Sequence, residues 1–134
     1  RLIYIDDYAH HPREIEASLS SIREMWPDKR LTVAFQPHLY SRTNDFYPEF
    51  AKSLNLADQV ILLDIYPARE QPIPGVTSGL IADRLTVPFV RVTKEEFPEY
   101  VKENVKEGVF MTVGAGDIDR FIPIFTEMFG GTDC

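Results

Sequence analysis

Short apolar runs alternate with amphipathic segments along the whole chain, and this alternation constrains the fold more than any other feature. Strands are expected at 2–6, 31–36, 59–64, 89–92 and 109–113. Between them apolar residues recur at helical spacing, as Ile15, Leu19 and Ile22 do in the first such segment. Strands that alternate with helices form a mainly parallel sheet. We therefore expect a three-layer, Rossmann-like α/β domain with helices on both faces of the sheet.

Local signals set the expected helix limits. Pro12 suits the first turn of the first helix, which should end at Pro27-Asp28. Four further helices are expected: from about 45 to 54 after a loop at 37–44, from a cap at Thr77 or Ser78 to Leu85, from Thr93 with Glu96 at capping-box spacing, and from 118 to 129. Gly130-Gly131 should end the last one, and a mobile tail should follow.

Bulk properties exclude several classes of function. The 134 residues suit one domain, and a net charge of −7 argues against nucleic-acid binding. No apolar run approaches the roughly 20 residues that cross a bilayer, so no membrane contact is expected. The only cysteine, Cys134, allows no internal disulfide, which suggests a cytoplasmic protein. Because the chain opens directly on strand-like residues, we expect it to be a piece of a longer protein.

Polar and titratable side chains follow four of the expected strands. They lie in the segments 7–11, 37–42, 66–70 and 114–117, and all three histidines are in the first two. In open α/β sheets, ligands bind beyond the carboxyl ends of the strands. These four loops should therefore converge on one edge of the sheet and form the ligand-binding region.

Each loop has a functional and a structural interpretation. A carboxylate of Asp6-Asp7 could accept ribose hydroxyls, or it could cap the next helix. Arg42 could hold a carboxylate or phosphate in a planar fork, or it could lie in solvent beside a helix. Gly114-Ala115-Gly116-Asp117 is expected to be a tight strand-to-helix turn, with an anion site at its amides as the lesser possibility. The sequence has no phosphate-binding Gly-Lys-Ser/Thr loop, zinc spacing or nucleophile elbow.

Taken together and in order, four segments resemble the third domain of the Mur ligases. They are DDYAHHPRE at 6–14, QPHLYSRT at 36–43, DIYPAREQPIPG at 64–75 and VGAGDI at 113–118. The first three are similar to the DDYGHHPTE, QPHRYTRT and DVYPAGEEPIPG segments of the branch that joins L-alanine to UDP-N-acetylmuramate. Each motif alone is weak, but together they cover nearly the whole chain.

The resemblance implies a role in peptidoglycan precursor synthesis. In this family ATP converts the muramate carboxylate to an acyl phosphate, which the amine of L-alanine attacks, and Mg²⁺ neutralises the crowded oxygens. Residues 1–134 would be the C-terminal domain, which closes over ATP and brings the amino acid. The N-terminal UDP-binding domain and the central ATPase domain are not in this sequence, so the fragment alone should be inactive. The partners would be UDP-N-acetylmuramate, L-alanine, ATP and the remaining domains of the same chain.

Site residues are carried over position by position. The resemblance implies that Asp7 accepts the ATP ribose hydroxyls and that Tyr8 lies beside the nucleotide. It implies that His10 and Arg42 hold the alanine carboxylate, with Arg69 in the loop that recognises the amino acid. It assigns no metal ligand and no certain catalytic residue to this chain.

One position departs from the family pattern, because Leu39 stands where the family has an arginine that helps to clamp this carboxylate. Two other functions remain open. One is the recycling ligase that attaches a preformed peptide to UDP-N-acetylmuramate, and the other is a free-standing nucleotide-binding or interaction module.

Overall fold

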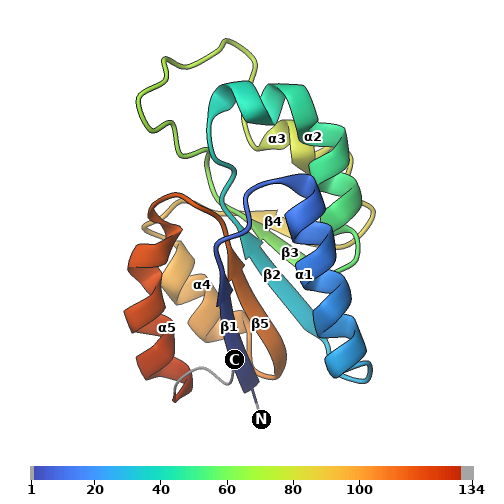
Figure 1. Cartoon of the computed structure of the whole chain (residues 1–134). Coiled ribbons are helices and arrows are strands. Elements are labelled where there is room, and N and C mark those ends of the chain that lie inside the picture. Colours follow the sequence, from blue (N-terminus) through green and yellow to red (C-terminus); the bar gives the residue numbers. More distant parts are fainter. Residues whose placement is uncertain (1, 131–134) are drawn as a thin grey trace.

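The computed structural model describes residues 2–130 and contains one parallel five-stranded sheet (Figure 1). The strands are β1 (Leu2–Asp7), β2 (Leu31–Phe35), β3 (Gln59–Leu62), β4 (Phe89–Arg91) and β5 (Gly108–Val113). Their order across the sheet is β1-β5-β2-β3-β4, and every pairing is parallel. The predicted parallel sheet is confirmed, with strand limits that differ by no more than a few residues from those expected.

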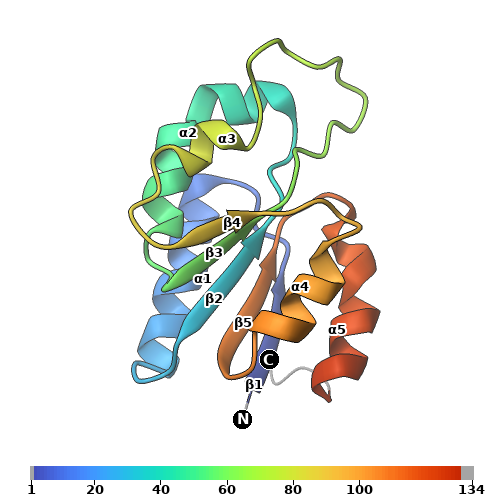
Figure 2. The same cartoon turned by 180° about the vertical axis from the view of Figure 1, so that it is seen from behind.

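Helices cover both faces of the sheet, which confirms the predicted three layers (Figures 1 and 2). The helices α1 (Pro12–Met25), α2 (Tyr40–Leu54) and α3 (Gly79–Ala82) pack on one face. The opposite face carries α4 (Phe97–Asn104), the 3₁₀ helix η1 (Asp117–Phe121) and α5 (Ile122–Phe129). Within residues 2–130, no helix combines the length and the apolar character that crossing a membrane requires.

Two apolar clusters, one on each face, stabilise the sheet. Neighbouring residues of β1 point to opposite faces, so that Ile3 and Ile5 pack against α1 and α2 while Tyr4 joins the other cluster. That second cluster is largely aromatic, and the Phe125 ring lies 5.1 Å from that of Phe97 and 5.2 Å from that of Phe110. Because both faces are covered, β2 and β5 are buried along their full length.

The chain path creates a crevice at the carboxyl ends of β2 and β5. These two strands are neighbours in the sheet, but the chain leaves β2 towards α2 on one face and leaves β5 towards η1 and α5 on the other. Loops that diverge in this way leave room for a ligand between them, and this is the usual binding position in open α/β sheets.

The start of α2 differs from the sequence prediction. The helix begins at Tyr40 and not near residue 45, although Leu39 at the N-cap supplies no capping side chain. The cap comes from another loop, because the Glu70 carboxylate accepts hydrogen bonds from the Ser41 backbone N–H, at 3.0 Å, and from the Ser41 hydroxyl. A cap supplied from so far along the chain leaves no local sequence signal.

Smaller differences concern the ends of the other helices. The helix α3 stops at Ala82 and not at Leu85, and the last helix is preceded by the 3₁₀ turn η1. Thr93 and Glu96 do exchange the expected hydrogen bonds, but α4 itself begins at Phe97. Gly130 ends α5 in the left-handed conformation, whereas Gly131 and the predicted mobile tail lie outside the described residues.

We expect Gly108→Ala to destabilise the fold by roughly 3 kcal/mol, and Gly75→Ala by only about 1 kcal/mol. Both glycines have positive φ, +86° and +81°. A Cβ at position 108 would overlap the carbonyl oxygen of Arg30, which the Val109 N–H holds at 2.8 Å, whereas a Cβ at position 75 would meet nothing within 4 Å. Urea unfolding of both variants measures the difference. Equal losses of stability would show that the Arg30 carbonyl does not restrict position 108 at the start of β5.

Candidate functional site

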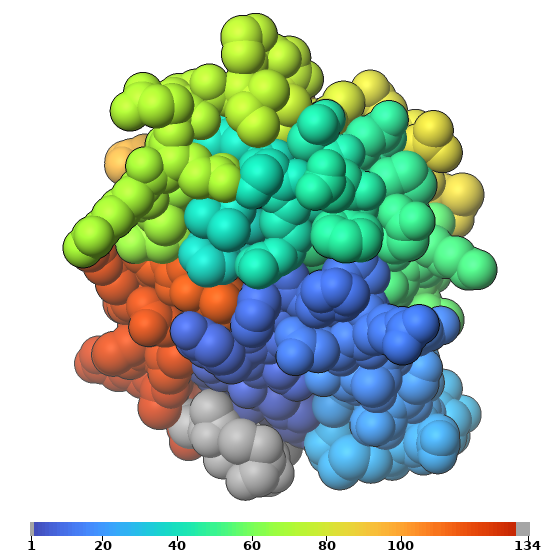
Figure 3. Space-filling model, turned by 45° about the horizontal axis from the view of Figure 1, so that its top comes forward, coloured from blue at the N-terminus to red at the C-terminus, as the bar shows by residue number. Residues whose placement is uncertain are grey.

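Loops after β1, β2 and β3 meet on one face of the molecule, where Figure 3 shows their blue, blue-green and yellow-green segments side by side. Four aromatic rings run across this meeting point. The ring centroids of Tyr8 and His10 are 5.6 Å apart, those of His10 and His38 6.1 Å, and those of His38 and Tyr66 5.7 Å. We call these four residues the aromatic row. It joins segments that are far apart in the sequence, at the edge where ligands were expected.

Asp7 lies at the first end of the row in a fixed orientation. One carboxylate oxygen accepts the Ala9 backbone N–H at 2.9 Å, and the other accepts the Ser18 hydroxyl at 2.6 Å. Each oxygen keeps a further lone pair, so the carboxylate can still accept a ligand hydroxyl. It lines a pocket of about 300 Å³ together with Tyr8, His10 and Ser18, and the Tyr8 side chain is well exposed there.

His10 is held by its own loop. Its Nδ1 lies 3.1 Å from the Tyr8 carbonyl oxygen. Because a carbonyl can only accept, Nδ1 donates, and Nε2 is the ring nitrogen available to a ligand. The backbone N–H groups of His10 and His11 both donate to Glu14, and the bond from His10 is the main reason why the pKa of the Glu14 carboxyl is lowered.

His38 connects His10 to Arg42. The Arg42 Nη1 lies 3.3 Å from the His38 Nδ1. A guanidinium has no acceptor, so the imidazole nitrogen accepts this bond, and His38 is neutral with its proton on Nε2. Burial lowers the pKa of the His38 imidazole, the charges of Arg42 and His10 lower it further, and Glu70 partly opposes them.

The structure therefore brings four of the five predicted site residues to one edge: Asp7, Tyr8, His10 and Arg42. Arg69 is the exception, because it is exposed in a turn that follows Ala68, and its neighbour Glu70 makes the contact with α2. Sequence reasoning did not single out His38 or Tyr66. The gathering of all three histidines in two neighbouring loops was the one available signal for His38.

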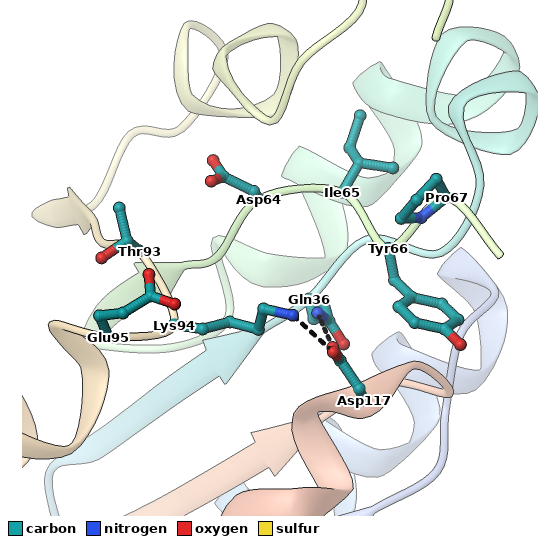
Figure 4. A pocket seen from close by; sticks show the side chains of 9 residues that line it. All are labelled: Gln36, Asp64, Ile65, Tyr66, Pro67, Thr93, Lys94, Glu95 and Asp117. Atoms are coloured by element: carbon teal, nitrogen blue, oxygen red, sulfur yellow. Dashed lines mark hydrogen bonds and ion pairs between the residues drawn. The ribbon is translucent and has the colours of Figure 1, made fainter. Parts of the chain in front are cut away.

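A second pocket, of about 120 Å³, lies at the carboxyl edge of the sheet, where the loops after β2, β3, β4 and β5 meet (Figure 4). Its polar lining consists of Gln36, Asp64, Tyr66, Thr93, Lys94, Glu95 and Asp117. The Asp117 carboxylate accepts hydrogen bonds from the Gln36 Nε2 and the Lys94 Nζ, each at 2.6 Å. Burial raises the pKa of the Asp117 carboxyl, but these two bonds and the Lys94 charge outweigh it, so that the pKa is lowered overall.

The same network explains the glycine-rich turn at 114–117. The Gln36 side-chain oxygen accepts the Ile118 backbone N–H at 2.9 Å, so this amide is already satisfied within the chain. A Cβ on Gly116 would lie 2.5 Å from that oxygen and 2.7 Å from the Tyr66 side chain. Close packing against β2 and the aromatic row thus requires glycine here, and the predicted tight strand-to-helix turn is confirmed.

Within residues 2–130, no three or more His, Cys, Asp or Glu side chains are grouped so that they could hold a metal ion. The site offers hydrogen-bond acceptors on the fixed Asp7 carboxylate and hydrogen-bond donors on the Arg42 guanidinium.

Fold and site together define a Rossmann-like ligand-binding domain with its polar groups at the carboxyl edge of the sheet. The family described as "Mur ligase, glutamate ligase domain" matches residues 1–116, and the chain belongs to this family. The resemblance inferred from the sequence motifs is confirmed.

Among curated proteins, a UDP-N-acetylmuramate–L-alanine ligase of Phocaeicola vulgatus is 54% identical over 92% of this chain. The chain spans only 27% of that relative. The crystal structure of the UDP-N-acetylmuramate-alanine ligase MurC from Thermotoga maritima matches 96% of this chain and 27% of its own, with 30% identity and a TM-score of 0.71. A murein peptide ligase from Psychrobacter arcticus has a TM-score of 0.74 at 17% identity, over 99% of this chain and 28% of its own, which shows a shared fold only.

We expect Asp117→Asn to destabilise the domain by about 1–3 kcal/mol near neutral pH. The amide cannot pair with the Lys94 charge, and it adds a buried donor. Because the folded-state pKa of Asp117 is lowered, its contribution is complete above the unfolded pKa and is lost as the pH falls through the folded pKa.

Urea unfolding at about pH 7 and about pH 3 measures this effect, and the gap between wild type and variant should close in acid. The matched control is Asp119→Asn, an exposed carboxylate of the same 3₁₀ helix, which should change stability by less than about 0.5 kcal/mol. A gap that stays constant with pH would show that the Asp117 charge does not stabilise the turn.

Proposed function

We propose that this chain is the C-terminal domain of an ATP-dependent ligase that joins L-alanine to UDP-N-acetylmuramate. The observation that carries the proposal is the combination of high identity to ligases of that name with a site in which Asp7, His10 and Arg42 share one edge. Since the chain spans about a quarter of those relatives, we assign UDP binding and the ATPase centre to other domains of the same protein. We place the reaction in the cytoplasm.

In the proposed reaction, the muramate carboxylate attacks the γ-phosphate of ATP, giving an acyl phosphate and ADP. The amine of L-alanine then attacks the acyl carbon, inorganic phosphate leaves, and the amine loses a proton. Mg²⁺ neutralises the phosphate oxygens in this chemistry. We assign its ligands to the other domains, since residues 2–130 provide no cluster for it.

The residues of this chain fit the binding of ATP and of the amino acid. The fixed Asp7 carboxylate suits two neighbouring ribose hydroxyls, and the exposed Tyr8 ring beside it suits contact with the nucleotide. His10 and Arg42 suit a carboxylate, because the Arg42 guanidinium is a permanent donor and the free Nε2 of His10 becomes a donor when the ring is protonated. Closure of this domain over the others would bring the two halves of the site together. We assign Arg69 a lesser role, as a second positive charge near the amino acid, because it lies exposed in a turn at the surface.

The recycling ligase is the less supported candidate, since a solved murein peptide ligase shares only the fold at 17% identity. Full-length protein supplied with free L-alanine or with a preformed tripeptide separates the two activities. The domain alone should release no phosphate from ATP above a buffer blank.

We expect Asp7→Ala in the full-length ligase to raise the KM for ATP roughly tenfold, through loss of charge-assisted hydrogen bonds to the ribose. The KM for UDP-N-acetylmuramate should stay nearly constant. Ser18→Ala is the matched control, because it removes the internal partner of Asp7 and keeps the carboxylate. Steady-state kinetics would refute the assignment if ATP binding were unchanged while muramate binding weakened.

We expect Arg42→Lys to raise the KM for L-alanine about tenfold and to leave the values for ATP and muramate nearly unchanged. Lysine keeps the charge but loses the planar fork. Leu39→Arg is the converse test and should hold or improve the affinity for L-alanine. Leu39 already has a positive φ of 73°, so arginine meets the same backbone conformation as the leucine it replaces. Equal effects of Arg42→Lys on all three substrates would instead indicate a defect in domain closure.

A further inference from the structure

His38 occupies the centre of the candidate site, although neither the motifs nor the proposed function gives it a role. It lies between His10 and Tyr66 in the aromatic row and contacts Arg42 directly. We propose that the neutral imidazole of His38 is a positioning residue, which holds the Arg42 guanidinium ready for the amino-acid carboxylate. Amino-acid binding then requires His38 to be unprotonated. This inference rests on the proposed function and specifies how its amino-acid subsite is built.

The backbone fixes His38 on both sides. The Tyr66 N–H donates to the Pro37 carbonyl at 2.8 Å, and the Leu39 N–H donates to the Tyr66 carbonyl at 2.8 Å. His38 therefore lies between two main-chain bonds to the loop after β3, and its ring stacks on that of Tyr66 with an interplanar angle of 28°. With its backbone and ring face held in this way, His38 presents its Nδ1 to Arg42.

Arg42 depends on that nitrogen for its orientation. It lies in the first turn of α2, and its guanidinium reaches back to the ring of His38, which precedes the helix. A long arginine side chain loses considerable rotamer freedom when it binds a ligand, and a contact made beforehand removes part of that cost. The bond from the Arg42 Nη1 to the His38 Nδ1 is such a contact.

Protonation of His38 would break the bond, because Nδ1 would then carry a hydrogen and two donors would face each other. The charged or titratable groups around the ring come from three elements. Arg42 belongs to α2, His10 to the loop after β1, and Glu70 and Tyr66 to the loop after β3. Burial, the charge of Arg42 and the electrostatic effect of His10 hold the pKa of His38 below its ordinary value, so the neutral, positioning form prevails at neutral pH.

Two variants distinguish the role of the hydrogen-bond acceptor at position 38 from the role of the imidazole ring. In His38→Asn, the side-chain oxygen takes the place of Nδ1 and accepts from Arg42 without titrating. In His38→Ala no acceptor remains. His11→Asn is the matched control, because the His11 ring packs on Phe46, 5.3 Å away, outside the aromatic row.

The first measurement is the KM for L-alanine of the full-length ligase between about pH 5.5 and 8, where histidine titrates. For wild type and His11→Asn, we expect this KM to rise about tenfold as the pH falls, with little change in the KM for ATP. His38→Asn should show a flat profile within about threefold of the wild-type value at pH 8, and His38→Ala a raised, flat one. The proposal is overturned if His38→Asn matches His38→Ala, if it retains the wild-type slope, or if the wild-type KM falls in acid.

The second measurement tests the contact without any substrate. In NMR titrations of the 134-residue chain, the Arg42 side-chain signals should shift with the same midpoint as the His38 ring, below about pH 6.5. The His38→Asn variant should abolish that shift. Independent titration of the two residues would overturn the proposal. Absence of alanine-dependent turnover in the wild-type ligase would instead refute the proposed function, because the NMR result does not depend on it.

Discussion

Burial of the sheet on both faces is the constraint on which the rest of the structure depends. The central strands β2 and β5 are buried at every position, so charged groups can stand only at the strand ends. The polar groups that do enter the core are fully paired. The Tyr4 hydroxyl lies 2.8 Å from the Thr112 hydroxyl, which donates to Asp6 at 2.6 Å. Since Thr112 has one hydrogen, Tyr4 must donate to it, and burial raises the pKa of Tyr4 to about 12.

This buried chain of hydroxyls also bears on the site, because it fixes the end of β1. Asp6 is tied to β5 through Thr112, and Asp7 follows directly with its own two partners. Burial is the main reason why the pKa of the Asp6 carboxyl is raised. The hydrogen bond from Thr112 lowers this pKa, and the charge of Asp7 raises it further. Two adjacent carboxylates thus have separate tasks. Asp6 joins the strands, whereas Asp7 stands at the edge with lone pairs to spare.

Most of the fold was predictable because its signals are local or periodic. The strands are continuous apolar runs, and Ile15, Leu19 and Ile22 of α1 are buried at the predicted helical spacing. The convergence of Asp7, His10 and Arg42 also followed, since the carboxyl ends of parallel strands share one edge. The features that escaped prediction depend on residues distant in sequence. Glu70 caps α2 at Ser41, and the stacking of His38 on Tyr66 needs the β2 and β3 loops side by side.

Leu39 shows how backbone and side chain make separate contributions at one position. Its φ of 73° and ψ of 137° fall in a region that non-glycine residues rarely adopt, at a cost of order 1–3 kcal/mol. Three hydrogen bonds hold it there, from its own N–H to Tyr66 and from the N–H and hydroxyl of Thr43 to its carbonyl. That conformation turns the chain within one residue from the bridge between His38 and Tyr66 into α2, and it places Arg42 in the first turn of the helix, within reach of His38. Because the turn is made by the backbone, leucine can replace the arginine of related ligases without moving Arg42. The loss is then confined to one cation, and the amino-acid subsite that we propose rests on the contact between His38 and Arg42.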